Sequence, residues 1–241
     1  MIFYKINLFI FIFFGYTSFS QSYNSKNIYN AYDELVSIEN TGLYNGVEFK
    51  DPYLNTDGSY RYFGHFNFTK GTIIYNNQFY ANVLLKYDVL HDNVITKSNN
   101  TFSYFNIKLI SENISAFSIY GHNFIKLTDT KLNRTDHIFF EILYIGNTIH
   151  LYTKHIKKKN RAIVNKRFQY RFKKDNLYLL FYNDAYYPID SIKDLNKIFP
   201  KNKKQINNFY KSYKSIYKSN RKRFMIEFVK YLNGTLENLN E

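Results

Sequence analysis

The alternation of hydrophobic and polar residues changes character near residue 190. From residue 60 to residue 182, short runs of β-branched and aromatic residues alternate with polar positions and are separated by Asn, Gly, Asp and Lys. A period of two is typical of half-buried strands. The predicted strands cover residues 60–68, 72–75, 78–88, 94–97, 101–110, 115–120, 123–127, 137–145, 148–155, 164–172 and 177–182.

The connections between these runs are short, which indicates an antiparallel sheet. No helical segment separates two runs, whereas parallel strands need a long crossover. The clearest hairpin joins residues 72–75 to 78–88 through Asn76 and Asn77, because Asn tolerates the left-handed conformation of a two-residue turn. We therefore predict a mainly β fold with some helix, in which an antiparallel meander forms a barrel or a sandwich.

After Ile189 the period changes to 3.6 residues, which predicts a C-terminal bundle of two to three basic amphipathic helices. Ser191 and Asp194 have the spacing of a capping box, for a short helix that stops at Pro200. Two further helices are predicted at residues 203–217 and 221–239. The predicted organisation is an N-terminal helix at 26–38 plus the antiparallel β domain, together residues 21–190, and a helical appendage packed on it, residues 191–241.

The first 20 residues have the pattern of a cleavable signal peptide. Lys5 precedes an apolar run over residues 6–14, shorter than the roughly 20 residues that a membrane-spanning helix needs. Ser18 and Ser20 place small residues before a cut ahead of Gln21. The chain has no Cys, so it lacks disulfides and the lipid-bearing Cys of a lipoprotein. We predict an exported protein, periplasmic or extracellular or peripheral to the outer membrane, with no membrane span after signal removal.

Basic residues gather in the last third of the chain. The whole sequence has a net charge of +14, whereas the segment from Lys154 to Arg223 alone has 21 Lys or Arg and 4 Asp or Glu. AT-rich codons would raise the number of lysines without clustering them, so the cluster indicates an anionic partner or a solvated face. Residues 157–161 are interpreted as a solvated hairpin tip. The residues of the predicted basic patch are Lys157, Lys158, Lys159, Arg161, Lys203, Lys204, Arg221, Lys222 and Arg223.

A series of short motifs runs along most of the mature chain. They are Leu43-Tyr44-Asn45-Gly46-Val47-Glu48-Phe49, Gly64-His65-Phe66, Lys70-Gly71-Thr72, Tyr80-Ala81-Asn82-Val83, Leu85-Lys86-Tyr87-Asp88, Phe117-Ser118-Ile119-Tyr120-Gly121-His122-Asn123-Phe124 and Tyr187-Pro188-Ile189. In this order they resemble a group of uncharacterised exported proteins of Bacteroidota. The resemblance implies an exported bacterial protein and carries no activity to particular residues.

The densest group of titratable residues is Asp88, His91 and Asp92, which are the first candidates for catalysis. On one continuous strand the two carboxylates would lie roughly 13 Å apart, too far for a glycosidase pair. If a turn intervenes, they approach each other, and Asp88 can accept backbone amides of the turn. The structural role is the favoured interpretation. No Gly-x-Ser-x-Gly or other nucleophile motif is present.

Cofactors and metals are not expected. The six His residues do not show the spacing of a metal site, and no Gly-rich phosphate loop is present. The aromatic and basic run at residues 167–174 suits stacking on nucleic-acid bases, but alternation on a half-buried strand produces the same pattern. We therefore expect no nucleic-acid partner.

The leading hypothesis is a non-enzymatic envelope protein that binds an anionic component. An anionic polymer, lipid headgroups and an acidic protein are the partners that fit the basic patch. One alternative is a lipocalin-like carrier that holds an apolar ligand inside a closed barrel. Another is a hydrolase whose carboxylate or His residues come together only in the fold.

Overall fold

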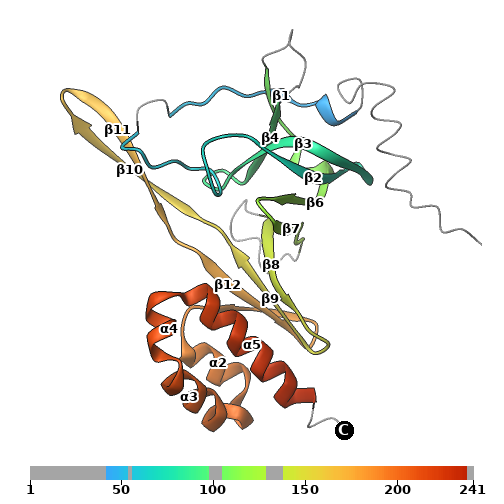
Figure 1. Cartoon of the computed structure of the whole chain (residues 1–241), viewed down its shortest axis with the longest axis vertical. Helices are drawn as coiled ribbons and strands as arrows, with labels where there is room; N and C mark the ends of the chain where they lie inside the picture. Colours follow the sequence, from blue (N-terminus) through green and yellow to red (C-terminus); the bar gives the residue numbers. More distant parts are fainter. Residues whose placement is uncertain (1–41, 54–55, 98–104, 129–137, 238–241) are drawn as a thin grey trace, which may run out of the picture.

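A computed structural model describes residues 42–53, 56–97, 105–128 and 138–237 of the chain (Figure 1). The predicted signal peptide and the predicted helix at 26–38 lie outside these residues. The strands are β1 Val47–Glu48, β2 Thr69–Tyr75, β3 Gln78–Asp88, β4 Asn93–Lys97, β5 Asn106–Lys108, β6 Ile114–Ile119, β7 His122–Lys126, β8 Phe139–Ile145, β9 Ile149–Lys154, β10 Lys157–Val164, β11 Arg167–Lys174, β12 Leu177–Tyr182 and β13 Ala185–Ile189.

Eleven of these strands form one sheet, in the order β1-β5-β4-β3-β2-β6-β7-β8-β9-β12-β13. Every ladder in it is antiparallel. Neighbouring strands follow one another along the chain, as in a meander, with three departures: β1 pairs with β5, β6 pairs with β2, and β9 pairs with β12 because β10 and β11 leave the sheet. β10 and β11 pair only with each other, as a second sheet of two strands. The predicted mainly β, antiparallel fold with C-terminal helices is confirmed.

The large sheet is strongly curved. β3 and β8 are four strand spacings apart in the sheet order, which is roughly 19 Å in a flat sheet. The rings of Tyr87 on β3 and Phe139 on β8 are nevertheless only 6.3 Å apart. Phe117 and Phe124, from the strands between them, fill the same core.

The curved sheet does not close into a barrel. β1 and β13 stand at its two ends, and no ladder joins them among the described residues. The concave side is filled by the hydrophobic core, which includes the fully buried Ile73, Leu85 and Tyr87. The barrel interior on which the lipocalin-like alternative depends is therefore not formed by this part of the chain.

Four of the described hairpins turn through two consecutive residues with positive φ. Asn76 and Asn77 have φ values of 50° and 62°, and Asn165 and Lys166 have the same values. Two-residue turns with positive φ at both positions match the twist of the strands that they connect. The hairpin predicted through Asn76 and Asn77 is confirmed.

The predictions for residues 60–68 and 157–161 are wrong. Residues 60–68 alternate like a strand but form only an isolated bridge, between Tyr62 and Asp88, because Gly64 has a positive φ of 66° and interrupts the extended backbone. Residues 157–161, predicted as a hairpin tip, belong to strand β10. Both faces of β10 are exposed over most of its length, so its sequence carries no period-two signal.

The C-terminal helices pack against one end of the sheet (Figure 1). They are α2 Ile192–Ile198, α3 Lys203–Ser212, α4 Lys214–Ser219 and α5 Arg221–Glu237, with short 3-10 turns at Gly42–Tyr44, Ser111–Asn113 and Pro200–Asn202. The capping box of Ser191 and Asp194 is present. The helix predicted over 203–217 is interrupted at Tyr213, which separates α3 from α4.

Helix α5 supplies most of the contact with the sheet. Phe224, Phe228 and Leu232 are fully buried in a core shared with β9 and β12. Further along α5, the side-chain oxygen of Asn233 accepts hydrogen bonds from the backbone amides of Thr148 and Ile149, both at 3.1 Å. Among the described residues, no helix has the length and apolar character to cross a membrane.

Candidate functional site: a basic arm and the residues at its base

Strands β10 and β11 form a two-stranded arm that leaves the sheet beyond β9 and β12 (Figure 1, yellow to orange). This basic arm, residues 157–174, contains nine Lys or Arg and no Asp or Glu. All residues from 158 to 168 are exposed. An isolated hairpin is at best marginally stable by itself. A long ribbon that buries little surface is therefore better explained by binding than by folding.

Like charges face each other across the base of the basic arm. Lys157 pairs in register with Lys174, and Lys158 with Lys173. Like charges directly opposite on an antiparallel pair destabilise it. Departures from such local rules are expected mainly at functional or strained sites.

The tip of the basic arm is apolar and basic at once. Ile163, Val164 and Phe168 are exposed by 71%, 44% and 49%, and Ile163 faces Phe168 across the strands. The guanidinium of Arg161 lies 4.1 Å from the centre of the Phe168 ring. Three exposed apolar residues thus lie beside the turn residue Lys166 and Arg167, the first residue of β11.

A strap formed by residues 56–59 fastens the basic arm to the body of the protein. The amide of Asp57 donates to the carbonyl of Tyr170 at 3.2 Å, and the amide of Phe172 donates to the Ser59 hydroxyl at 2.8 Å. Arg171 forms an ion pair with Asp57. Phe172, only 6% exposed, anchors the inner end of the arm.

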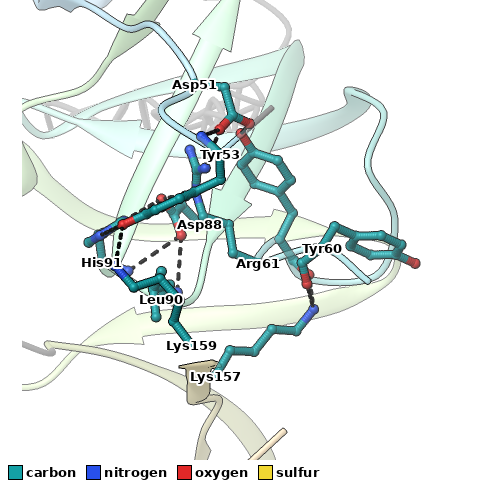
Figure 2. Close-up of polar contacts among 10 residues, drawn as sticks. Asp51, Tyr53, Tyr60, Arg61, Asp88, Leu90, His91, Lys157 and Lys159 are labelled. Carbon is teal, nitrogen blue, oxygen red and sulfur yellow. Dashed lines mark hydrogen bonds and ion pairs between the residues drawn. The ribbon is translucent and has the colours of Figure 1, made fainter. Parts of the chain in front are cut away.

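A second group of polar contacts, which we call the Arg61 cluster, comprises Asp51, Tyr53, Arg61, Asp88 and His91 (Figure 2). The Arg61 guanidinium donates to Asp88 at 2.7 Å and also pairs with Asp51, while lying 5.0 Å from the centre of the Tyr53 ring. Burial by itself would raise the pKa of Asp51. Hydrogen bonds from Tyr62, the backbone of Tyr53 and Arg61 outweigh it, and the pKa is lowered.

Two lysines of β10 join the basic arm to this cluster (Figure 2). The Lys157 ammonium donates to the carbonyls of Tyr60 and Tyr62, the latter at 3.0 Å, and the Lys159 ammonium donates to the Tyr53 hydroxyl at 3.1 Å. Burial and the positive charge of Lys174 lower the pKa of Lys157 to about 8. The cations at the base thus hold the arm in place.

The three predicted catalytic residues divide between two networks. Because β3 ends at Asp88 and β4 begins at Asn93, a turn intervenes, and Asp88 accepts the amide of Leu90 at 3.0 Å. His91 lies 2.9 Å from the other Asp88 oxygen, which Arg61 also contacts. Since partners already occupy both oxygens of Asp88, a carboxylate that is 0% exposed, its geometry fits a structural role.

Asp92 belongs to a separate buried pair. Its carboxylate lies 2.5 Å from the ammonium of Lys154, and it accepts the amide of Phe139 at 3.1 Å. Burial lowers the pKa of Lys154 to about 8, against the attraction of Asp92. No sequence pattern pairs Lys154 with Asp92, because they are 62 residues apart along the chain.

Beside the inner end of the basic arm lies a cavity of about 570 Å³, which we call the base pocket. It is bounded by the inner end of the arm, residues 59–65 and the start of α5. Among the described residues, Tyr60, Tyr62, Phe63, Tyr120 and Phe172 line it, and no Asp or Glu does. The basic and His residues of its lining are His65, His122, His155, Lys157, Lys174 and Lys222.

Glu141 on β8 lies behind this lining and joins three of its groups. Its carboxylate meets His122 at 2.5 Å, His155 at 2.6 Å and Lys222 at 2.7 Å. Burial would raise the pKa of Glu141, but these three hydrogen bonds lower it to about 2. No sequence motif indicated this network, because its members come from β7, β8, the end of β9 and α5.

The predicted basic patch is divided by the fold. Lys157 and Lys222 border the base pocket, whereas Lys203 begins α3, next to Lys201, which lines a hollow near Leu236 at the far end of α5. The 17 residues of α5 span roughly 25 Å. Lys203 and Lys204 are therefore remote from the basic arm.

These features define a curved, open antiparallel β-sheet protein with a basic two-stranded arm and a helical C-terminal part. The chain matches no protein-family model, no curated protein and no solved structure. The resemblance to exported proteins of Bacteroidota therefore remains a prediction, and a functional proposal has to start from the arm and its base.

Proposed function

We propose that this chain is an exported, non-enzymatic protein that attaches to an anionic lipid surface through the basic arm. The observation that carries the proposal is the combination, on one exposed ribbon, of nine cations without a carboxylate and an apolar tip. Basic segments next to a membrane gain about 1 kcal/mol for each Lys or Arg near anionic lipids. Apolar side chains that enter the headgroup region add to this attraction.

Several cations of the arm are available for such contacts. Among the described residues, no carboxylate forms an ion pair with Arg161, Lys166, Arg167, Lys173 or Lys174. The arm also stands away from the sheet and helices (Figure 1), so its outer part can approach a flat surface. This accessibility supports the proposal.

The apolar tip favours a lipid surface over a soluble anionic polymer. A polyanion in water would be held by the cations alone and would leave Ile163, Val164 and Phe168 in solvent. A bilayer offers anionic headgroups and, a few ångströms deeper, an apolar region. The arm matches that order, with the apolar residues at its end and the cations behind and beside them.

Co-sedimentation with vesicles tests the proposal. The mature chain should bind vesicles of phosphatidylglycerol and phosphatidylcholine, bind pure phosphatidylcholine much more weakly, and dissociate as salt rises. Replacing Lys166, Arg167 and Lys173 by Gln should weaken binding about 100-fold, since about three charge contacts are lost. Unchanged binding of this triple variant would contradict the proposal.

A matched variant controls for total charge. Replacing Lys203, Lys204 and Lys211 by Gln removes the same charge from exposed positions of α3, far from the basic arm. Binding of this variant should stay within about threefold of the wild type, a difference well below 1 kcal/mol. Equal losses in both triple variants would indicate attraction by net charge alone, and would also contradict a specific role of the arm.

A further inference from the structure

The base pocket combines two features that recur in sites for small charged ligands: aromatic walls, and two lysines, Lys157 and Lys174, that form no ion pair with a carboxylate among the described residues. Its volume of about 570 Å³ lies within the range of small-molecule sites, about 300–1,000 Å³. It is distinct from the outer part of the basic arm, since only the innermost arm residues reach it.

Some basic groups of the pocket have a carboxylate partner and others do not. Glu141 forms short hydrogen bonds with His122, His155 and Lys222. Lys157 and Lys174 are directly opposite each other on β10 and β11, and neither has a carboxylate partner among the described residues. Lys157 is half-buried and donates only to backbone carbonyls. An oxyanion between the two ammonium groups would relieve their mutual repulsion.

Aromatic rings form the remaining walls. Phe63 lies edge-on to His155, with ring centres 4.7 Å apart, and His65 lies edge-on to Tyr120 at 5.4 Å. Tyr60 and Tyr120 also line the pocket and remain partly exposed. Tyr rings present an apolar face with a polar end, which suits a ligand that is itself a ring with hydroxyl groups.

We propose that the base pocket binds an acidic sugar, with its carboxylate, sulfate or phosphate between Lys157 and Lys174 and its ring against the aromatic walls. The cross-strand lysine pair supplies the charge that the oxyanion requires. Tyr60, Tyr120 and Asn176 supply the stacking surfaces and hydrogen-bonding groups along the sides. The site does not depend on the attachment of the arm tip to lipid.

Isothermal titration of the mature chain tests this site with glucuronate, glucose 6-sulfate and glucose 6-phosphate, using glucose and inorganic phosphate as references. At least one charged sugar should bind about tenfold or more tightly than both references, since it makes charge-assisted contacts and ring contacts together. Absence of binding by all three charged sugars would overturn the proposal. Inorganic phosphate that binds as well as they do would also overturn it, because the ring would then contribute nothing.

Two single variants, at neighbouring lysines on opposite faces of β11, distinguish binding in the base pocket from binding on the surface of the arm. Lys174→Gln removes an exposed pocket lysine and should lower the affinity for the charged sugar about tenfold or more. Lys173→Gln removes its neighbour on the opposite face of β11 and should leave that affinity within about twofold. Equal effects of both variants on sugar binding would overturn the assignment. Both should weaken vesicle binding alike, so failure of one proposal can be distinguished from failure of the other.

Discussion

At the scale of single residues, the buried carboxylates of this protein each meet several donors. Asp88 accepts from Arg61 and His91, and Glu141 is contacted by His122, His155 and Lys222. A carboxylate is costly to bury unless such partners compensate for lost hydration. Glu141 is the clearest case, because its partners join strands of the sheet to the first turn of α5.

Replacing Glu141 by Gln should lower the free energy of unfolding at pH 7 by roughly 3 kcal/mol, because Lys222 loses its buried counter-ion. In urea titrations, the wild type should lose stability as the pH falls from about 4.5 towards 2, since the pKa of Glu141 is about 2 in the folded protein and 4.5 ordinarily. Above that range its contribution is fully present.

The Glu141→Gln variant should lack this component of the pH dependence. Glu227→Gln, which changes an exposed Glu of α5 paired with Lys230 at 3.6 Å, should shift stability by less than about 0.5 kcal/mol. An equally steep acid loss in wild type and Glu141→Gln would show that the network does not stabilise the fold.

At the scale of elements, the folded core does not depend on the basic arm for its packing. Its outer residues are exposed on both faces, whereas β9 and β12 pair directly with each other from Ile149 to Lys154. The core should therefore tolerate a shorter arm. A segment kept without a packing role is a candidate for a binding role.

Replacing residues 163–168 by Asn-Gly tests this separation. Val164 and Arg167 flank the present turn, and because pairs alternate along the ladder, Ala162 and Gln169 can flank an equivalent two-residue turn. The free energy of unfolding in urea should change by less than about 1 kcal/mol, while binding to anionic vesicles should fall steeply. A loss of stability beyond about 2 kcal/mol would instead make the tip part of the fold.

At the scale of the whole molecule, one buried ion pair spans the curvature of the sheet. Six strand spacings separate β4 from β9 in the sheet order, roughly 29 Å if the sheet were flat. Yet Asp92, just before β4, lies 2.5 Å from Lys154 at the end of β9. The pair therefore fixes how far the sheet bends.

Replacing Lys154 by Met should lower the free energy of unfolding by about 3–5 kcal/mol, because the buried Asp92 carboxylate loses the ammonium group that lies 2.5 Å from it. Adding Asp92→Asn should recover part of the loss, since Asn keeps an acceptor for the Phe139 amide and carries no charge. Thermal or urea unfolding measures both variants. A double variant no more stable than Lys154→Met would mean that the charge of Asp92 is not the source of the loss.

The sequence pattern was sufficient for local structure. The asparagine hairpin, the capping box at Ser191 and the antiparallel class follow from residue preferences and short connections. The pattern could not show the return of β6 to β2, or β10, whose residues from Lys158 onward are exposed on both faces. The order of strands in a sheet does not change the period of apolar residues along the chain, and a strand exposed on both faces has no alternation of apolar and polar residues.

For the candidate site, sequence proximity was a partial guide. Asp88 and His91 are paired, as their spacing across a turn allows. Glu141 and Lys154 were missed because their partners are distant in sequence. Lys203 was grouped with Arg221, although Arg221 begins α5 and Lys203 lies near the other end of that helix. The charge count indicated the segment from Lys154 to Arg223, which contains the basic arm. The apolar tip emerges only from the exposure of Ile163, Val164 and Phe168.

The most direct test of the proposed attachment places a single reporter at the tip. The chain has no Trp. The variant Phe168→Trp and, as a control, Tyr231→Trp, at a 40% exposed position of α5, therefore each carry a single Trp whose emission can be excited selectively. With anionic vesicles, the emission of Phe168→Trp should shift to shorter wavelength and be quenched by brominated lipids, while that of Tyr231→Trp stays unchanged. An unchanged spectrum of Phe168→Trp on vesicles that bind the protein would contradict insertion of the tip.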